Sequence, residues 1–257
     1  MTLRSRIGDL RRRFLCNTHK RSVPIDHAGP VVSFSFDDFP RTAYTTGGSI
    51  LKSFGVRGTY YAAPGLMNTS NALGDQLCSK DIESLLADGH ELGSHTFSHA
   101  SCRRVSRAAF EQDALRGQDA LQRMTGHDVA SFSYPYGHVS LYLKRTLGGQ
   151  MASCRSIYGG INAPSADMNL LLANSLYGDL DQYPAAEALL HEAKRQRGWI
   201  IFYTHDVRRE PSAFGCTPEL LDKVIAHVLE IGLPILPIGE VVKLAMKAAM
   251  PSLARSK

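Results

Sequence analysis

The sequence has only one tryptophan and lacks a long apolar run. Without a run of about eighteen apolar residues, the sequence predicts no membrane-spanning helix. The first twenty residues carry five arginines but no apolar stretch, so we expect no secretory signal. At 257 residues and 44% apolar, the chain is long enough for one large α/β domain with a substantial core.

The cysteines are few, odd in number and scattered, and none has CxxC spacing. Such a set favours free thiols over a disulfide framework or a cysteine-based zinc site. We therefore expect a cytoplasmic protein, with free thiols at Cys16, Cys78, Cys102, Cys154 and Cys216.

The net charge is +5, from 29 basic and 24 acidic residues, and much of the excess lies at the two ends. No nucleic-acid motif accompanies it, so no nucleic-acid partner is expected. Between the first arginines, apolar residues recur at roughly helical spacing, which favours peripheral contact with the anionic inner membrane surface. Solvated or disordered ends, or packing on the domain, are the alternatives. The apolar residues are Leu3, Ile7, Leu10 and Phe14.

Short apolar runs alternate with helical patterns along the chain. This alternation implies parallel strands with right-handed crossovers, in either a barrel or an open sheet. The stretch 158–184 is expected to be an irregular surface excursion. Strands are expected at 31–37, 57–62, 90–94, 130–134, 150–154, 199–204 and 234–237, and helices near 46–54, 79–88, 106–124, 138–147, 185–197, 217–231 and 239–248.

Carboxylates and imidazoles stand at the ends of these apolar runs. Asp37 and Asp38 close the first strand, His95 and His99 follow the third, and His205 ends a late one. Two histidines four apart can present their rings from one side of a helical turn. One aspartate and two histidines, with an open fourth position, are typical of a catalytic zinc. The second carboxylate is then left for acid–base chemistry.

Four motifs in this order resemble those of the polysaccharide deacetylases, the NodB-like carbohydrate esterases. They are Ser35-Phe36-Asp37-Asp38, Ser94-His95-Thr96-Phe97-Ser98-His99, Phe132-Ser133-Tyr134-Pro135-Tyr136-Gly137 and Ile201-Phe202-Tyr203-Thr204-His205. The resemblance implies a single-domain α/β fold, a distorted (β/α) barrel expected to have seven parallel strands. We expect a basic extension at 1–28, the catalytic domain at 29–248 and a basic tail at 249–257.

The resemblance also implies a role for each site residue. Asp38, His95 and His99 would hold Zn²⁺, or another divalent transition metal such as Co²⁺. Asp37 would act as the general base and His205 as the acid for the leaving amine. The backbone N–H of Tyr136 would stabilise the oxyanion, and Pro135, Tyr136 and Arg155 would contact substrate.

The sequence departs from the family pattern at two positions that affect the acid–base properties of Asp37 and His205. The family's third motif often begins with an arginine that contacts the catalytic aspartate, and here that position is Ser133. The later Asp-Trp motif has no clear match. Arg155, just past the fifth expected strand, could replace the missing guanidinium or could instead contact solvent or substrate.

Adjacent strand residues face opposite sides, so both aspartates can serve one site only if the chain bends there. Phe39-Pro40 is expected to supply that bend. We expect a zinc-dependent N-deacetylase that acts on a lipid- or nucleotide-linked sugar precursor of a surface polysaccharide or lipopolysaccharide. An O-deacetylase or other amidase of the same fold, or a glycan-binding pseudoenzyme, are the alternatives.

Overall fold

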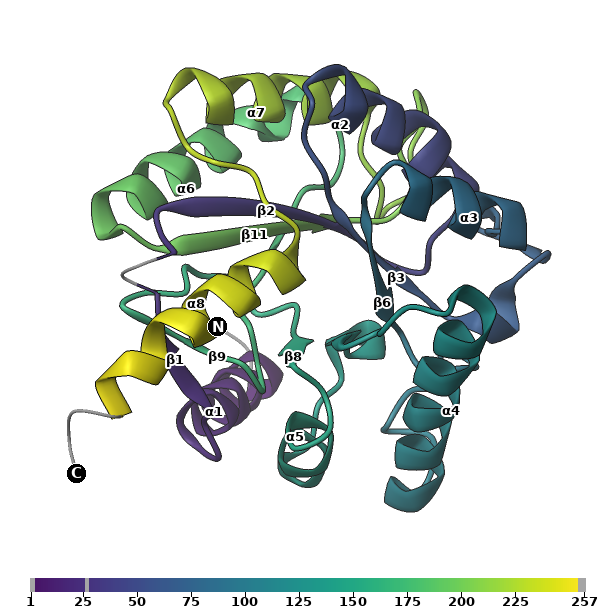
Figure 1. Ribbon diagram of the computed structural model, residues 1–257, viewed down its shortest axis with the longest axis vertical. Coiled ribbons are helices and arrows are strands. Elements are labelled where there is room, and N and C mark those ends of the chain that lie inside the picture. Colours follow the sequence, from purple (N-terminus) through teal and green to yellow (C-terminus); the bar gives the residue numbers. More distant parts are fainter. Residues whose placement is uncertain (1–2, 26–27, 254–257) are drawn as a thin grey trace.

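A curled, all-parallel sheet of seven strands forms the centre of the protein (Figure 1). The computed structural model describes residues 3–25 and 28–253. The strand order is β10-β11-β2-β3-β6-β7-β8, and every neighbouring pair is parallel. The strands are β2 (Val31–Phe36), β3 (Thr59–Ala62), β6 (Glu91–Ser94), β7 (Ser131–Ser133), β8 (Ser153–Arg155), β10 (Asn174–Ser175) and β11 (Trp199–Thr204).

Six helices follow one another around the outer face of the sheet: α2 (Ser49–Ser53), α3 (Ser79–Ala87), α4 (Arg107–Thr125), α5 (Leu141–Gly148), α6 (Tyr183–Gln196) and α7 (Pro218–Glu230) (Figure 1). Three begin with a hydroxyl cap, because Ser106, Ser140 and Thr217 each accept the backbone N–H three residues later. Apolar side chains such as Phe34, Phe202 and Leu221 fill the layer between sheet and helices.

The curled sheet almost closes into a barrel. At the end of the edge strand β8, its last residue, Arg155, forms a single parallel bridge with Leu171, which lies just before the opposite edge strand β10. The two edges therefore meet through one bridge and irregular chain instead of a full ladder, which confirms the expected distorted barrel. The last helix, α8 (Ile238–Leu253), covers the N-terminal ends of the strands, where the N–H of Ile238 donates to Thr59 Oγ1.

Most expected elements are confirmed, with two corrections. The apolar segment 234–237 is not a strand of the sheet; Ile235 forms only an isolated bridge with Val32. The seventh strand is β10, whose two residues are too short to give a periodic signal. It lies in the stretch 158–184, which also holds β9 (Ser165–Asp167), so that stretch is not a simple surface excursion. The remaining short strands are β1 (Ser22–Pro24), paired with β9, and the hairpin β4 (Ser70–Asn71) with β5 (Gly74–Asp75).

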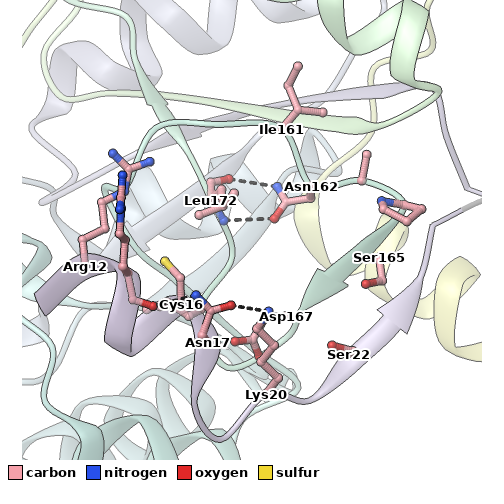
Figure 2. Close-up of a pocket in the computed structure, with 14 residues that line it drawn as sticks. Arg12, Cys16, Asn17, Lys20, Ser22, Ile161, Asn162, Ser165, Asp167 and Leu172 are labelled. Atoms are coloured by element: carbon pink, nitrogen blue, oxygen red, sulfur yellow. Dashed lines mark hydrogen bonds between the residues drawn. The ribbon is translucent and has the colours of Figure 1, made fainter. Parts of the chain in front are cut away.

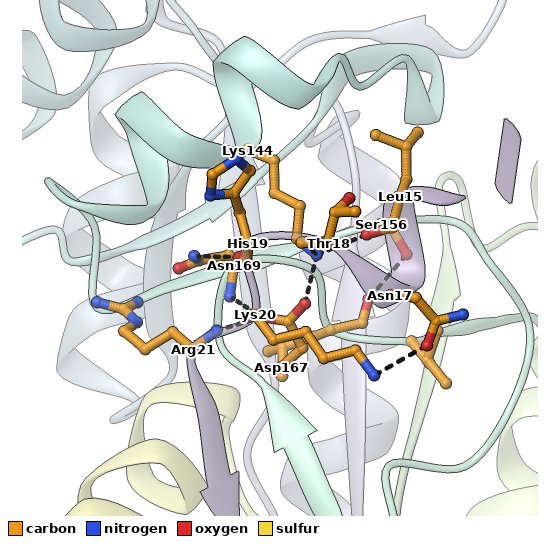
Figure 3. Close-up of polar contacts among 12 residues, drawn as sticks. Leu15, Asn17, Thr18, His19, Lys20, Arg21, Lys144, Ser156, Asp167 and Asn169 are labelled. Carbon is orange, nitrogen blue, oxygen red and sulfur yellow. Dashed lines mark hydrogen bonds and ion pairs between the residues drawn. The ribbon is translucent and has the colours of Figure 1, made fainter. Parts of the chain in front are cut away.

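The basic N-terminal segment forms a helix, α1 (Leu3–Asn17), that is attached to the barrel. Leu15 is buried, and the buried Lys144 ammonium donates to the carbonyls of Leu15 and Thr18, both at 2.6 Å (Figure 3). Asp167 Oδ2 lies 2.6 Å from the same ammonium. A cation at the last carbonyls of a helix is favourable because the helix dipole is negative there.

The predicted apolar face of this segment is only partly visible. Leu10 and Phe14 are exposed, whereas the side chains of Leu3 and Ile7 lie outside the described residues. Within residues 3–25 and 28–253, no helix combines the length and apolarity needed to cross a bilayer. The expected boundaries at 28 and 248 stay predictions.

Candidate metal centre and active site

The chain bends sharply after β2, and this bend brings both aspartates to one place. Val32, Phe34 and Phe36 pack in the outer layer, so strand alternation leaves Asp37 on the inner face and would send Asp38 outward. Asp38 and Phe39 instead have positive φ angles of 60° and 56°. Non-glycine residues seldom adopt this conformation, and the complete burial of the Phe39 ring holds it in place. The bend is therefore real and begins at Asp38, before Pro40.

The two histidines of the second motif lie on a loop, and the expectation of a helical turn is wrong. Thr96 and His99 have positive φ angles of 63° and 55°, which no regular helix contains. Helix α4 supports the loop, because the Ser98 N–H and hydroxyl both donate to Asp113 Oδ2, at 3.1 and 3.0 Å. A side chain at Gly117 of α4 would meet the Thr96 carbonyl oxygen at 2.5 Å, so the helix packs directly against the turn.

Asp38, His95 and His99 converge on one point. Asp38 Oδ1 lies 3.3 Å from His95 Nε2 and 3.0 Å from His99 Nε2. Ligands held tetrahedrally at zinc distances are separated by roughly 3.3–3.6 Å, so this spacing is close to that of a shared cation. All three side chains are largely shielded from solvent.

Hydrogen bonding at this point also fits a cation. The His95 Nδ1 lies 2.8 Å from the Ser133 carbonyl oxygen, which can only accept, so Nδ1 carries the proton and Nε2 presents a lone pair. That lone pair faces Asp38 Oδ1, a buried oxygen without a hydrogen-bond partner. The trio therefore suits a divalent metal.

Arg155 forms a buried ion pair with the other aspartate. Its Nη2 donates to both carboxylate oxygens of Asp37 and to Ser133 Oγ, and its Nη1 donates to the Ser156 carbonyl at 2.9 Å. Burial acts to lower the pKa of Arg155, but the Asp37 carboxylate more than offsets it and raises that pKa.

Strand register explains how Arg155 reaches Asp37. Ser133 on β7 pairs with Arg155 on β8, so the guanidinium extends past a small hydroxyl side chain toward β2. An arginine at 133 would need the space that Arg155 occupies. Arg155 is fully buried, and the alternative, a guanidinium supplied to Asp37, has the required geometry. Contact of Arg155 with substrate stays a prediction.

His205 follows β11, the strand that pairs with β2, so it lies at the same end of the barrel as the aspartates. Its Nδ1 lies 3.1 Å from the Phe214 carbonyl oxygen, which leaves Nε2 free to exchange a proton. Sequence reasoning missed the residue that shapes this loop. Buried Asp206 accepts from the Ser212 N–H at 2.9 Å and from the Ser212 hydroxyl, and its Oδ2 lies 2.8 Å from Arg208 Nε.

Tyr136 borders the trio from a short turn after β7. It has a φ of 59°, its ring centroid is 4.5 Å from that of His99, and the side chain is 53% exposed. Pro135, which precedes it, is buried. Tyr136 is thus the side chain of this motif that a ligand beside the trio would meet, whereas Pro135 contributes by fixing the turn.

Two other features involve none of the expected site residues. One is a cavity of about 750 Å³ between α1 and residues 161–172 (Figure 2). A second group that could hold a metal joins α6 and α7, and consists of Glu187, His191 and His227.

Comparisons with known proteins indicate one family. The family model for polysaccharide deacetylase matches residues 25–151. The peptidoglycan-N-acetylglucosamine deacetylase PgdA of Listeria monocytogenes is 25% identical over 143 residues, which cover 55% of this chain. The match spans only 29% of the length of that curated relative.

Solved structures share the fold at low identity. The peptidoglycan deacetylase PdaC from Bacillus subtilis has a TM-score of 0.53 and 17% identity, over 89% of this chain and 97% of that chain. A CE4 family pseudoenzyme from Bacillus anthracis has a TM-score of 0.53 and 15% identity, over 84% and 66% of the two chains. These likenesses show the fold, and both active and inactive relatives have it.

Proposed function

We propose that this chain, which belongs to the polysaccharide deacetylase family, is a metal-dependent hydrolase that removes the N-acetyl group from an N-acetylated sugar. The observation that carries the proposal is the convergence of Asp38, His95 and His99 beside a second, ion-paired carboxylate. The relative PgdA, named for peptidoglycan N-acetylglucosamine, supports an N-acetylated sugar as the substrate class.

Asp38, His95 and His99 would hold the metal, for which we propose Zn²⁺, with Co²⁺ as an alternative. When bound, such a cation polarises a carbonyl oxygen and lowers the pKa of water. Everything else that the reaction needs must come from the protein: a base, an oxyanion donor and an acid.

We assign those three roles to residues around the trio. Asp37 takes a proton from the attacking water, and Arg155 compensates its negative charge and fixes its orientation. The backbone N–H of Tyr136 donates to the oxyanion that develops on the acetyl carbonyl. His205, held through Nδ1 by the Phe214 carbonyl, protonates the departing amine from Nε2. A proton is required there because an amide anion is too poor a leaving group.

We further propose a cytoplasmic location and a precursor substrate, a lipid- or nucleotide-linked sugar used for a surface polysaccharide or lipopolysaccharide. The five cysteines support a reducing compartment, since all are free thiols. Peripheral contact with the inner membrane is part of the same proposal. It is supported by Leu10 and Phe14, which are exposed on a helix that also carries arginines.

A glycan-binding pseudoenzyme is the competing function that a specific observation supports. A structural neighbour is a pseudoenzyme, so the fold by itself does not guarantee turnover. In this chain, the metal trio, Asp37 and His205 are all present at one end of the barrel, which favours catalysis over simple glycan binding.

The test is acetate release from a panel of N-acetylated and O-acetylated sugars and non-sugar amides, with chelated protein and protein reloaded with zinc. We expect release from N-acetylated sugars that needs the metal. Release only from O-acetyl esters or non-sugar amides would support another hydrolase of this fold. Glycan binding without release from any compound would support the pseudoenzyme.

A further inference from the structure

Four arginines from two distant parts of the chain gather around His138 and Tyr158, near Tyr136. Arg11 and Arg12 belong to α1, whereas Arg103 and Arg104 follow the loop that carries His95 and His99. All four are exposed. We call these four residues the arginine cluster.

His138 is close both to the cluster and to Tyr136, which borders the trio of Asp38, His95 and His99. Its ring centroid is 5.6 Å from that of Tyr136, whose own ring lies 4.5 Å from the ring of His99. The Ser101 hydroxyl lies 2.8 Å from His138 Nδ1, and the Cys102 thiol donates to the His138 carbonyl at 3.2 Å. These two contacts place the chain that leads into Arg103 directly against His138.

Helix α1 brings the other two arginines to the same place. Arg11 donates to the carbonyl of Val139, the residue after His138, at 3.0 Å. Arg12 donates to the Gly159 carbonyl, and its guanidinium lies 5.7 Å from the centre of the Tyr158 ring. The buried Lys144 contacts at the C-terminal end of α1 fix this helix on the barrel (Figure 3).

Among the side chains that the structure describes, at residues 10–25 and 28–249, no carboxylate forms an ion pair with these four arginines. The ion pairs found there occupy other arginines: Arg41, Arg57, Arg123, Arg155, Arg195 and Arg208. The positive charge of these arginines affects the pKa values of two neighbouring side chains, His138 and Tyr158. Burial lowers the pKa of His138, and Arg103, Arg11 and Arg104 lower it further. Burial raises the pKa of Tyr158, and Arg11, Arg103 and Arg12 oppose that rise.

We propose that the arginine cluster binds the phosphate of a phosphorylated N-acetylated sugar while its acetamide lies at the metal trio. The inference rests on the proposed function and narrows its substrate class. In a 2-acetamido sugar, the carbon that bears the acetamide is bonded to the anomeric carbon, where a phosphate ester is carried. We place the sugar ring against the exposed Tyr136 side chain, which neighbours His99 of the trio on one side and His138 on the other. A neutral glycan has no group that uses these charges, whereas guanidinium groups bind phosphate with charge-assisted hydrogen bonds.

The test compares N-acetylglucosamine 1-phosphate with the uncharged methyl glycoside of N-acetylglucosamine, in the zinc-loaded full chain. Two quantities are measured: kcat/KM for acetate release, and Kd by calorimetry, which needs no turnover. We expect the phosphorylated sugar to be preferred by about tenfold or more, the size of one charge-assisted contact. An Arg103→Ala/Arg104→Ala variant should lose most of this preference, mainly through KM. Arg195→Ala, an exposed arginine on α6, is the matched control and should keep it. Added salt should weaken the preference.

The outcomes separate this inference from the proposed function. Equal binding and hydrolysis of both sugars, or a preference that the double variant keeps, overturns the phosphate site even if the chain is a deacetylase. Tighter, cluster-dependent binding of the phosphorylated sugar without acetate release supports the site and refutes the deacetylase. A nucleotide-linked sugar and a lipid-linked sugar in micelles, run alongside, identify the natural carrier of the phosphate. Binding of the cluster to anionic vesicles alone, with no phosphorylated-sugar preference, overturns the proposal in favour of a membrane surface.

Discussion

The guanidinium of Arg155 donates to both carboxylate oxygens of Asp37, although 118 residues separate them in the chain. Both side chains are buried, and the Tyr61 and Tyr203 rings lie 5.2 and 4.8 Å from the guanidinium. Asp37 is therefore a carboxylate held in one orientation, with its charge balanced, beside the trio of Asp38, His95 and His99 for which we propose a metal. A general base needs this arrangement if it is to stay ionised and still face a water molecule.

Removal of Arg155 should destabilise the protein, because it leaves the Asp37 charge buried and unpaired. For Arg155→Met we expect a loss of about 3–5 kcal/mol in the free energy of unfolding, measured by urea titration. The double variant Arg155→Met/Asp37→Asn should recover much of that loss, since no unpaired charge remains. A small loss in the single variant, or no recovery in the double, would show that the ion pair contributes little.

Asp37→Asn should separate catalysis from metal binding. The amide keeps the shape of the side chain but cannot accept a proton, so acetate release should fall by roughly 10²–10⁴-fold. Zinc content, measured by elemental analysis, should match that of the wild-type protein. If Asp37→Asn loses its zinc while Asp38→Asn keeps it, the two aspartates have been assigned in the wrong order.

His99→Ala should weaken zinc binding at the trio, because two protein ligands remain where three are needed. Calorimetric zinc titration can follow this change without reference to activity. His191→Ala is the control, since it alters the second potential metal group, between α6 and α7, and leaves the trio intact. The expectation fails if His99→Ala binds zinc as tightly as wild type, or if only His191→Ala reduces the binding.

His90 should make the protein less stable in mild acid. Burial lowers its pKa from 6.5 to about 4, and its Nδ1 accepts the Gly58 N–H at 3.1 Å, so the folded state holds it neutral. The unfolded chain takes up a proton below pH 6.5, which the folded chain does only near pH 4. Stability is therefore lost as the pH falls through this window, by about 3 kcal/mol in total.

The measurement is the free energy of unfolding at pH 7, 6, 5 and 4, compared with that of His90→Asn. Asparagine can still accept the Gly58 N–H but does not titrate, so the variant should show a shallower dependence on pH across this window. Identical pH profiles for the two proteins would assign the acid sensitivity to other groups.

Contact with the membrane should depend on the exposed apolar residues of α1. Deletion of the segment is a poor test, because Leu15 and the contacts of Lys144 attach α1 to the barrel. Leu10→Ser/Phe14→Ser leaves these contacts in place and should reduce co-sedimentation with anionic liposomes at low salt. Leu180→Ser, at an exposed position elsewhere, is the control. If all three proteins sediment equally with the liposomes, or if none of them does, the exposed apolar residues of α1 have no role in membrane contact.

Much of the fold and the metal trio follows from the sequence, because both depend on local signals. Apolar runs mark the strands, and functional side chains at the ends of parallel strands must meet at one end of a barrel. The pair Asp37-Asp38 and the spacing of His95 and His99 therefore predict the trio even though the local backbone differs. The loop that carries the histidines adopts positive φ angles because α4 supports it, a tertiary effect that spacing cannot reveal.

Other parts of the site depend on relationships between distant segments. The sequence offers Arg155 as one possible partner of Asp37, but the pairing depends on the register of Ser133 with Arg155 on the neighbouring strand. Strand β10 has two residues, too few for a period-two pattern, and its place is set by pairing with β11. Asp206 directly follows His205, and its burial could have been suspected, but its role in shaping the loop depends on contacts with Ser212 and Arg208.

The central claim is that the trio and Asp37 together hydrolyse an N-acetyl group. The most direct measurement is acetate release from an N-acetylated sugar by wild-type, Asp37→Asn and His99→Ala proteins, each stripped of metal and then titrated with zinc. In the wild type, the account predicts that the rate of acetate release rises to its maximum with one equivalent of zinc. In zinc-loaded Asp37→Asn the rate should be at least roughly a hundredfold lower. His99→Ala should need excess zinc before it releases acetate. Release that is independent of zinc, or equal in wild type and Asp37→Asn, would contradict it.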